Sequence, residues 1–437
     1  MRLLRNVIVG LWNYAFRLVA REHLLSLFNQ VLVSGTSFLT TILIARWSDL
    51  RQLGVYAVGF SLVGFAVTCQ DSLILDPYLI QRHYPEGTAA ERAGASLTLS
   101  AMFSAASALV LALASLGFLE WGDNSEMAMT TLSMAAVMPI ALTRNFVRRF
   151  SFARLEFERV LVLDTTTALV LLSALAWLGL TGRLSALSAW AAIGGAYTFS
   201  TAIWLYRLRA EFSIRLFYVR TVLKQTWMLG RWLVAAQIAS QLQGNATYWL
   251  CIAIAGAKET GVFAACMSIV AFANPLLQGL SNTWMPRLVL ARTNGGGPAL
   301  RREVIRNCLL IGILLAVFSL VIFLVGGKAL HLLYPGTEVE GIGNTLTILA
   351  LSMLAGAMGW PVSMALATEE RPLSIIIPVM VGALLTITFV FLLLPKWGLL
   401  GAAIGLLGGS IAGTISRSVA FFSLVPKTHA TASRQCR

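Results

Sequence analysis

The sequence is poor in charged residues, which make up only 12% of its 437 residues. Soluble domains usually carry about a quarter charged residues, so the composition excludes an ordinary soluble protein. Apolar residues make up 57% of the chain, and the mean hydropathy is +0.77. We therefore expect an integral membrane protein with short connections and no sizeable water-soluble domain.

The sequence also lacks the motifs that mark catalysis and cofactor or metal binding. It contains no GxxxxGK[ST] phosphate loop, no GxSxG nucleophile elbow and no HExxH zinc helix. The five cysteines show no CxxC spacing, and the four histidines are scattered. These absences favour a transporter over an enzyme, and we expect no cofactor and no metal site.

Twelve apolar stretches are long enough to form membrane-spanning helices. They are residues 24–47, 53–80, 95–119, 127–143, 160–181 and 185–206, followed by 229–256, 261–286, 308–332, 342–368, 373–394 and 399–425. When the connections are assigned alternately to two sides, 27 of the 33 Lys and Arg residues fall on the side that holds both termini. A cluster of five arginines, at 144–159, is expected in the connection after the fourth span.

This charge asymmetry indicates how the chain is oriented in the membrane. It also indicates what the net charge of +14 implies about partners. The positive-inside rule places the arginine-rich side in the cytoplasm. We therefore expect a multi-pass protein of the inner (plasma) membrane with both termini cytoplasmic. On a soluble protein the same net charge would suggest nucleic acid, but here the basic residues border spans, so we expect no nucleic-acid partner.

The pattern also divides the chain into five regions. Polar residues in the first 22 positions recur near a 3.6-residue period, typical of an amphipathic helix at the membrane interface. Residues 207–226 show the same pattern, although a short basic loop is the alternative there. We predict an interfacial helix (1–22), an N-terminal six-helix bundle (23–206), a cytoplasmic amphipathic linker (207–228), a C-terminal six-helix bundle (229–426) and a cytoplasmic tail (427–437).

An internal repeat appears when the chain is compared with itself at an offset of 207 residues. The segment GVYA at 54–57 then falls on GVFA at 261–264, and Gln30 falls on Gln237. Six spans separate the two copies, so the halves insert with the same orientation. The fold class that follows is an all-α polytopic membrane protein with about twelve spans in two parallel six-helix repeats around a central cavity.

Polar residues form rows on single helix faces inside three predicted spans. The rows are Gln30, Ser34, Ser37 and Thr41 in the first span, Gln237, Gln241 and Asn245 in the seventh, and Asn274, Gln278 and Asn282 in the eighth. Residues three or four apart share one face of a helix. Such rows either line a substrate pathway or form hydrogen bonds between packed helices.

Few charges lie deep in the predicted spans. Arg417, Arg231 and Arg46 are candidates for a pathway that carries an anionic group, because a guanidinium can donate two parallel hydrogen bonds to a phosphate. Anchoring at the membrane interface is the alternative for each of them. Asp71 is the candidate for coupling transport to a proton or cation.

Two segments resemble those of a known transporter family. The run QVLVSGTSFLTTILIARWSDLRQLGVYAVGFSLVGFAVTCQDSLILDPYLIQR and the run AKETGVFAACMSIVAFANPLLQGLSNTWMPRL resemble the openings of the two halves of polysaccharide exporters. These belong to the oligosaccharide flippase branch of the multidrug/oligosaccharidyl-lipid/polysaccharide exporter superfamily. The resemblance implies twelve or fourteen spans, a central cavity and alternating access.

The same resemblance implies a function: movement of an undecaprenyl-pyrophosphate-linked glycan from the cytoplasmic to the outer leaflet, in exopolysaccharide or O-antigen synthesis. The implied partners are the lipid-linked glycan, membrane lipid, a coupling ion (H⁺ or Na⁺) and polysaccharide assembly proteins. Two alternatives stay open. One is a multidrug extruder driven by Na⁺ or H⁺, and the other is a membrane partner of polysaccharide assembly that transports nothing itself.

Overall fold

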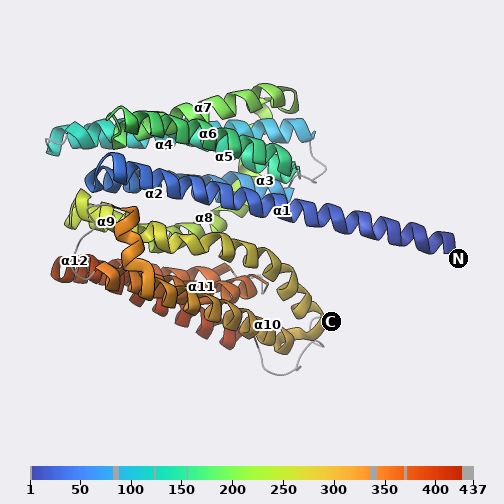
Figure 1. Ribbon diagram of the computed structural model, residues 1–437. Coiled ribbons are helices and arrows are strands. Elements are labelled where there is room, and N and C mark those ends of the chain that lie inside the picture. The colour runs from blue at the N-terminus through green and yellow to red at the C-terminus, as the bar shows by residue number, and fades with distance from the viewer. Residues whose placement is uncertain are drawn as a thin grey trace.

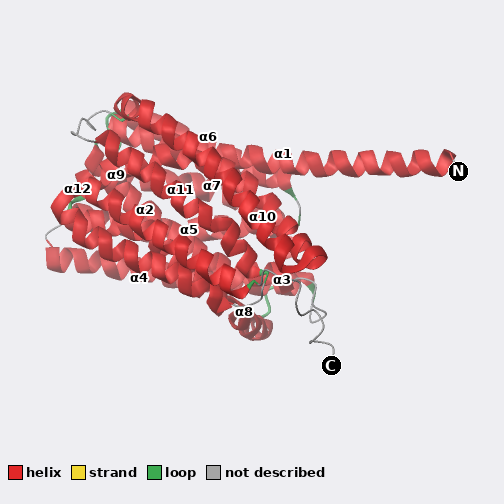
Figure 2. Ribbon diagram, turned by 90° about the horizontal axis from the view of Figure 1, so that it is seen from below, coloured by secondary structure: helices red, strands yellow, loops and turns green. Residues whose placement is uncertain are grey.

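The computed structural model describes residues 2–81, 88–122, 125–154, 156–334, 342–368 and 372–425. Within these ranges every regular element is a helix and no strand occurs. The helices form two side-by-side bundles, with the N-terminal half (blue to green) above the C-terminal half (yellow to red) in Figure 1; Figure 2 shows the same helices from below. The expected all-α architecture is confirmed, while the predicted tail 427–437 lies outside the described residues.

The N-terminal half holds the first six predicted spans. Its elements are α1 (Arg2–Trp47), α2 (Leu50–Gln70), the π-helical turn η1 (Asp71–Leu75), α3 (Asp76–Gln81), α4 (Ala89–Gly122), α5 (Ser125–Ala153), α6 (Phe157–Leu180) and α7 (Ala186–Leu208). Short polar side chains start the helices: Asp49 accepts a hydrogen bond from the backbone N–H of Gln52 at 2.7 Å, and Ser185 and Ser188 form a capping box at α7. The stretch predicted as an interfacial helix is continuous with the first span in α1, and Figure 1 shows it extending past the bundle.

The C-terminal half holds the other six spans. Its elements are η2 (Arg209–Glu211), α8 (Leu216–Ile254), α9 (Ala257–Val270), η3 (Ala271–Ala273), α10 (Asn274–Leu333), α11 (Ile342–Ala367) and α12 (Pro372–Leu424). Both α10 and α12 reverse within one continuous element, at Gly296 (φ 62°) and Gly398 (φ 56°). Positive φ favours glycine because it has no Cβ.

The span count follows from these elements. In the described ranges, nine helical stretches are long and apolar enough to cross a membrane. The stretch Leu373–Leu424 folds at Gly398 into two spans, and α7 and α8 fall outside the nine because they are less apolar or carry more charge. With Leu373–Leu424 counted as two spans and with α7 and α8 added, the total is the twelve spans that the sequence predicts. The chain is a multi-pass membrane protein.

The region between α7 and α8 docks on the N-terminal half. The backbone N–H of Ser213 donates to the carbonyl of Ala90 at 3.0 Å, and Arg215 pairs with Glu91 at 3.0 Å. Arg154 pairs with Glu211 at 2.8 Å, and this hydrogen bond raises the pKa of Arg154. The second part of the predicted linker is the start of α8, which continues unbroken into the seventh span.

The two halves meet where α2 packs against α9. A Cβ added to Gly54 would lie 2.8 Å from the backbone N of Gly261, and one added to Gly261 would lie 3.1 Å from the backbone N of Gly54. The Cβ added to Gly54 would also clash with the carbonyl oxygen of Ala257, and the Cβ added to Gly261 would clash with that of Leu50. Both pairs are related by the 207-residue offset, so the contact is reciprocal, as across a two-fold axis. This confirms the predicted repeat.

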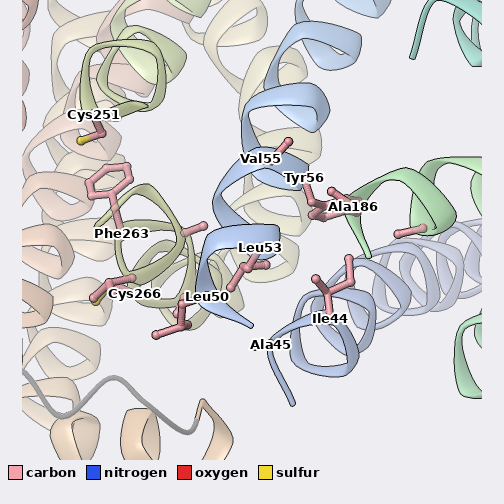
Figure 3. Close-up of a cluster of buried hydrophobic side chains, with 14 of the residues drawn as sticks. Ile44, Ala45, Leu50, Leu53, Val55, Tyr56, Ala186, Cys251, Phe263 and Cys266 are labelled. Carbon is pink, nitrogen blue, oxygen red and sulfur yellow. The ribbon is translucent and has the colours of Figure 1, made fainter. Parts of the chain in front are cut away.

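A core of buried apolar side chains surrounds this contact. One cluster of buried apolar side chains contains residues from both halves, including Ile44, Leu53 and Tyr56 from the first and Phe263 and Cys266 from the second. Figure 3 shows Leu53 and Tyr56 on α2, Phe263 and Cys266 on α9, and Ile44 on α1. This end of the interface between the halves is the one that the charge pattern places outside the cell. The apolar packing holds the halves together there.

Candidate functional site

Arg417 is the most unusual charge in the described part of the C-terminal half. It lies on the second segment of α12, and only 7% of its surface is exposed. One terminal nitrogen donates to Gln243 Oε1 of α8 at 3.2 Å, while its Nε is buried without a hydrogen-bond acceptor. Among the described residues no carboxylate lies within ion-pair distance of it, so the guanidinium keeps a donor and a full positive charge uncompensated.

Glycines create the space around this side chain. A Cβ at Gly359 of α11 would lie 2.5 Å from Arg417 Nη1, and a Cβ at Gly382 would lie 3.0 Å from Gln243 Nε2. Gly413 faces Gly382 with a hypothetical Cβ to Cα distance of 3.2 Å. Larger residues here would push the guanidinium and the amide apart, so the small residues let α8, α11 and α12 close around Arg417.

In the N-terminal half, buried aspartates form ion pairs with arginines. Asp164 of α6 is 2% exposed and accepts hydrogen bonds from both Arg144 and Arg148 of α5, with the Arg148 Nε at 2.8 Å. Asn29 of α1 donates to the same carboxylate at 2.9 Å. The network joins α1, α5 and α6 inside the bundle.

Asp71 forms a second network beside the first. It begins the π-helical turn η1 and is 9% exposed. Its Oδ1 accepts from Asn145 at 2.7 Å, and its Oδ2 accepts from Arg149 at 3.1 Å and 2.6 Å. Gln70 joins by accepting from Asn145 at 2.9 Å. The candidate coupling residue is therefore ion-paired.

The arginines in these networks were expected in a connection, because the fourth predicted span ended at residue 143. Helix α5 instead continues to Ala153. The signal that could have found this is the spacing in TRNFVRRF: 144 and 148 lie one turn apart, as do 145 and 149, so two polar pairs face two different neighbours. Each pair meets one aspartate.

The polar row of α8 divides between two roles. Gln241 Nε2 donates to Thr68 Oγ1 of α2 at 2.5 Å, and Asn245 Nδ2 donates to Gln241 Oε1 at 2.6 Å. Gln241 therefore bridges the halves, and Asn245 holds its amide from one turn along α8. Gln237, one turn earlier, is exposed.

The rows of the first and eighth spans differ in their exposure. Gln30, Ser34, Ser37 and Thr41 are all half-buried on α1. The Thr41 hydroxyl donates to the carbonyl of Ser37 at 2.8 Å. Asn274 and Gln278 are both exposed near the start of α10. Just before them, Phe272 of η3 meets Phe38 of α1 edge-on at 5.0 Å, a further contact between the halves.

The two other candidate arginines do not join Arg417. Arg46 lies at the opposite end of the molecule, exposed, where its guanidinium donates to the carbonyls of Leu332 and Leu333 (3.1 Å for Leu333). A cation placed on the last carbonyls of a helix stabilises that end, so Arg46 fastens α1 to α10. Arg231 is exposed on α8.

Solved structures of known proteins share this arrangement over nearly their whole length. An inward-facing multidrug resistance MATE family transporter of the MOP superfamily matches with a TM-score of 0.68 at 16% identity, covering 94% of this chain and 96% of that one. The chain has the fold of the MATE transporters. The outward-facing conformation of such a transporter matches with a TM-score of 0.66 at 15% identity, covering 93% and 96%.

A MOP superfamily transporter from Pyrococcus furiosus has the same fold, with a TM-score of 0.67 at 14% identity and coverage of 92% and 95%. Its description states that a binding pocket of reverse polarity suggests a different function for that protein. No family model and no curated protein matches the chain. At these identities the comparisons establish the MATE-like fold, with its two like halves, and leave the substrate to be argued from the residues.

Proposed function

We propose that the chain is a membrane transporter that moves a lipid-linked oligosaccharide from the cytoplasmic to the outer leaflet by alternating access. The observation that carries the proposal is Arg417: a buried guanidinium with no described carboxylate partner and one unused donor. A lipid-linked glycan contains a phosphate or pyrophosphate between lipid and sugar. Arginine can bind such a group through two parallel charge-assisted hydrogen bonds.

The exposed amides form the proposed route for the sugar. Gln237, Asn274 and Gln278 are exposed on α8 and α10, and Gln30 is half-buried on α1. Amide side chains both donate and accept hydrogen bonds, which suits sugar hydroxyls. The pathway that we propose therefore combines one fixed cation for the phosphate with amides for the glycan.

The proposal places the protein in the inner (plasma) membrane with both termini in the cytoplasm, in agreement with the charge asymmetry of the connections. Exopolysaccharide or O-antigen synthesis supplies the substrate, and polysaccharide assembly proteins are the expected partners. The polymer precursor is made on the cytoplasmic leaflet, so the transporter acts between its synthesis and its polymerisation.

Asp71 is the proposed coupling group for H⁺ or Na⁺. Protonation or cation binding at its carboxylate would compete with Arg149, which holds Oδ2 at 2.6 Å and 3.1 Å. This competition would loosen α5 from the π-helical turn that begins at Asp71. Asp71→Asn, which keeps the shape and removes the charge, is expected to abolish the dependence of transport on a proton or sodium gradient. Unchanged gradient dependence in proteoliposomes would remove Asp71 from coupling.

The deciding experiment deletes the gene and measures which leaflet holds the lipid-linked glycan. Accumulation on the cytoplasmic leaflet, reversed by the intact chain and not by Arg417→Gln, is expected. Arg183→Gln provides the matched control, because Arg183 is an exposed arginine in the short turn between α6 and α7. Unchanged glycan orientation in the deletion strain would overturn the proposal and favour a non-transporting assembly partner.

Multidrug extrusion is the second candidate, favoured by the MATE fold of the solved neighbours. An extruder of cationic drugs needs carboxylates open to the pathway, whereas Asp71 and Asp164 are both ion-paired with arginines. Accumulation of a fluorescent cation such as ethidium in the same deletion strain separates the two. Raised ethidium with normal glycan orientation would replace the flippase by the extruder.

A further inference from the structure

A pocket of about 730 Å³ lies away from Arg417, at the arginine-rich end of the C-terminal half. It is lined by Pro298, Arg301, Arg302 and Ile305 of α10 and by Phe422 of α12. The α10 residues follow Gly296, where the helix reverses direction, and Phe422 lies two residues before the end of α12. The pocket is thus at the level where two spans leave the membrane on the predicted cytoplasmic side.

Arg301 is held rigidly in this pocket. One terminal nitrogen donates to the carbonyl of Phe422 at 2.7 Å and also to that of Val425, and the guanidinium lies 5.1 Å from the centre of the Phe422 ring. Its Nε is buried and has no acceptor among the described residues. These contacts fix the orientation of a planar cation and leave one of its donors unused.

The charge of the pocket is not neutralised by its neighbours. Arg302 is exposed beside Arg301. Glu303, the next residue, is held by Arg306 at 2.7 Å. The sequence from 426 to 437 contains Lys427, Arg434 and Arg437 and no Asp or Glu side chain.

Apolar side chains continue from the pocket towards the membrane interior. Ile305, Leu309, Ile313 and Val317 are exposed at four-residue intervals along α10, and Phe422, Val419 and Ile415 are exposed along α12. Residues at these spacings share one helix face. A ligand seated here meets two cations at one end and two apolar helix faces at the other, which is the chemistry of a phospholipid.

We propose that this pocket binds the phosphate headgroup of an anionic phospholipid from the cytoplasmic leaflet, with its acyl chains along the exposed faces of α10 and α12. Basic pockets between spans on the cytoplasmic side are suited to such headgroups. The site is separate from the transport pathway. A lipid bound here bridges the α10 reversal and the end of α12, so it stabilises the C-terminal half.

The test measures lipid retained by the purified full chain after delipidation, using native mass spectrometry with added phosphatidylglycerol or phosphatidylcholine. Retention of phosphatidylglycerol over phosphatidylcholine is expected, and Arg302→Gln should lower it about fivefold, the effect of one arginine near an anionic surface. Arg287→Gln is the matched control, because Arg287 is also an exposed arginine of α10 and does not line the pocket. It should retain the lipid.

Three results would overturn the proposal. The first is equal retention by Arg302→Gln and the intact chain, and the second is equal retention of the two lipids. The third is displacement of phosphatidylglycerol by millimolar inorganic phosphate, which would assign the pocket to a free anion. Because binding is read without transport, the outcome is independent of the proposed flippase activity.

Discussion

The two halves share a fold and treat buried charge in opposite ways. In the N-terminal half, Arg144 and Arg148 face Asp164, and Arg149 faces Asp71. In the C-terminal half, Arg417 faces only the amide of Gln243 among the described residues. A duplicated scaffold has thus kept its helix packing while diverging in electrostatics. The ion pairs hold the helices of the N-terminal half together, whereas the unpaired cation of the C-terminal half is the group that we propose receives an anion.

The largest expected effect tests the paired half. Asp164→Ala removes the carboxylate and leaves Arg144 and Arg148 facing each other inside the bundle. Loss of one member of a buried ion pair costs about 3–5 kcal/mol, so we expect a lower unfolding temperature in detergent and less folded protein in the membrane. Asp164→Asn keeps the volume and should recover only part of the loss. A variant as stable as the intact chain would show that the network contributes nothing.

The corresponding change in the other half should act in the opposite direction. Arg417→Met removes a buried charge that lacks a described carboxylate partner and replaces it with an apolar chain of similar length, so thermal stability should stay equal or rise. Transport should fall by about ten- to a hundredfold, because a hydrogen bond to a charged group contributes about 1.5–3 kcal/mol. Measured together, unfolding temperature and glycan transport distinguish a binding cation from a packing one. A loss of stability with normal transport would contradict the comparison.

The architecture and the site differ in how far they can be predicted from sequence. Twelve spans, two like halves and the 207-residue repeat follow from composition and periodicity, because lipid demands long apolar helices. The GVYA and GVFA segments even mark the reciprocal contact of Gly54 and Gly261. Partner choice for charges does not follow. Arg144 and Arg417 look equally basic in the sequence, and only the arrangement of α5 against α6, and of α12 against α8, shows which has a carboxylate.

The contact between Gly54 of α2 and Gly261 of α9, which we call the glycine seam, tests whether the two halves meet symmetrically. Gly54→Ala places a methyl group against the backbone of α9, and overpacking of this kind costs about 1–3 kcal/mol. Gly261→Ala should have a similar cost, because its contact is the reciprocal one. Gly64→Ala is the matched control on α2, with nothing within 4 Å of the added Cβ, and it should be neutral or slightly stabilising. Unequal unfolding temperatures for the Gly54 and Gly261 variants would break the symmetry inferred for the seam.

The smallest expected effect on stability separates pathway from packing on α8. Gln241→Leu removes the hydrogen bond to Thr68 that bridges the halves, and such a bond between membrane helices contributes about 0.6 kcal/mol. It also removes the bond from Asn245 within α8. Its unfolding temperature should fall slightly. Gln237→Leu changes an exposed amide one turn away, so it should leave stability unchanged and lower glycan transport.

The double variant Gln237→Leu/Gln241→Leu should remain inserted in the membrane and export poorly. Membrane insertion is checked by fractionation and export by the leaflet assay. Normal export by the double variant would remove α8 from the pathway. Gln241→Leu alone could also account for the whole defect. In that case α8 would contribute to transport through the hydrogen bond to Thr68, and not through the exposed amide of Gln237.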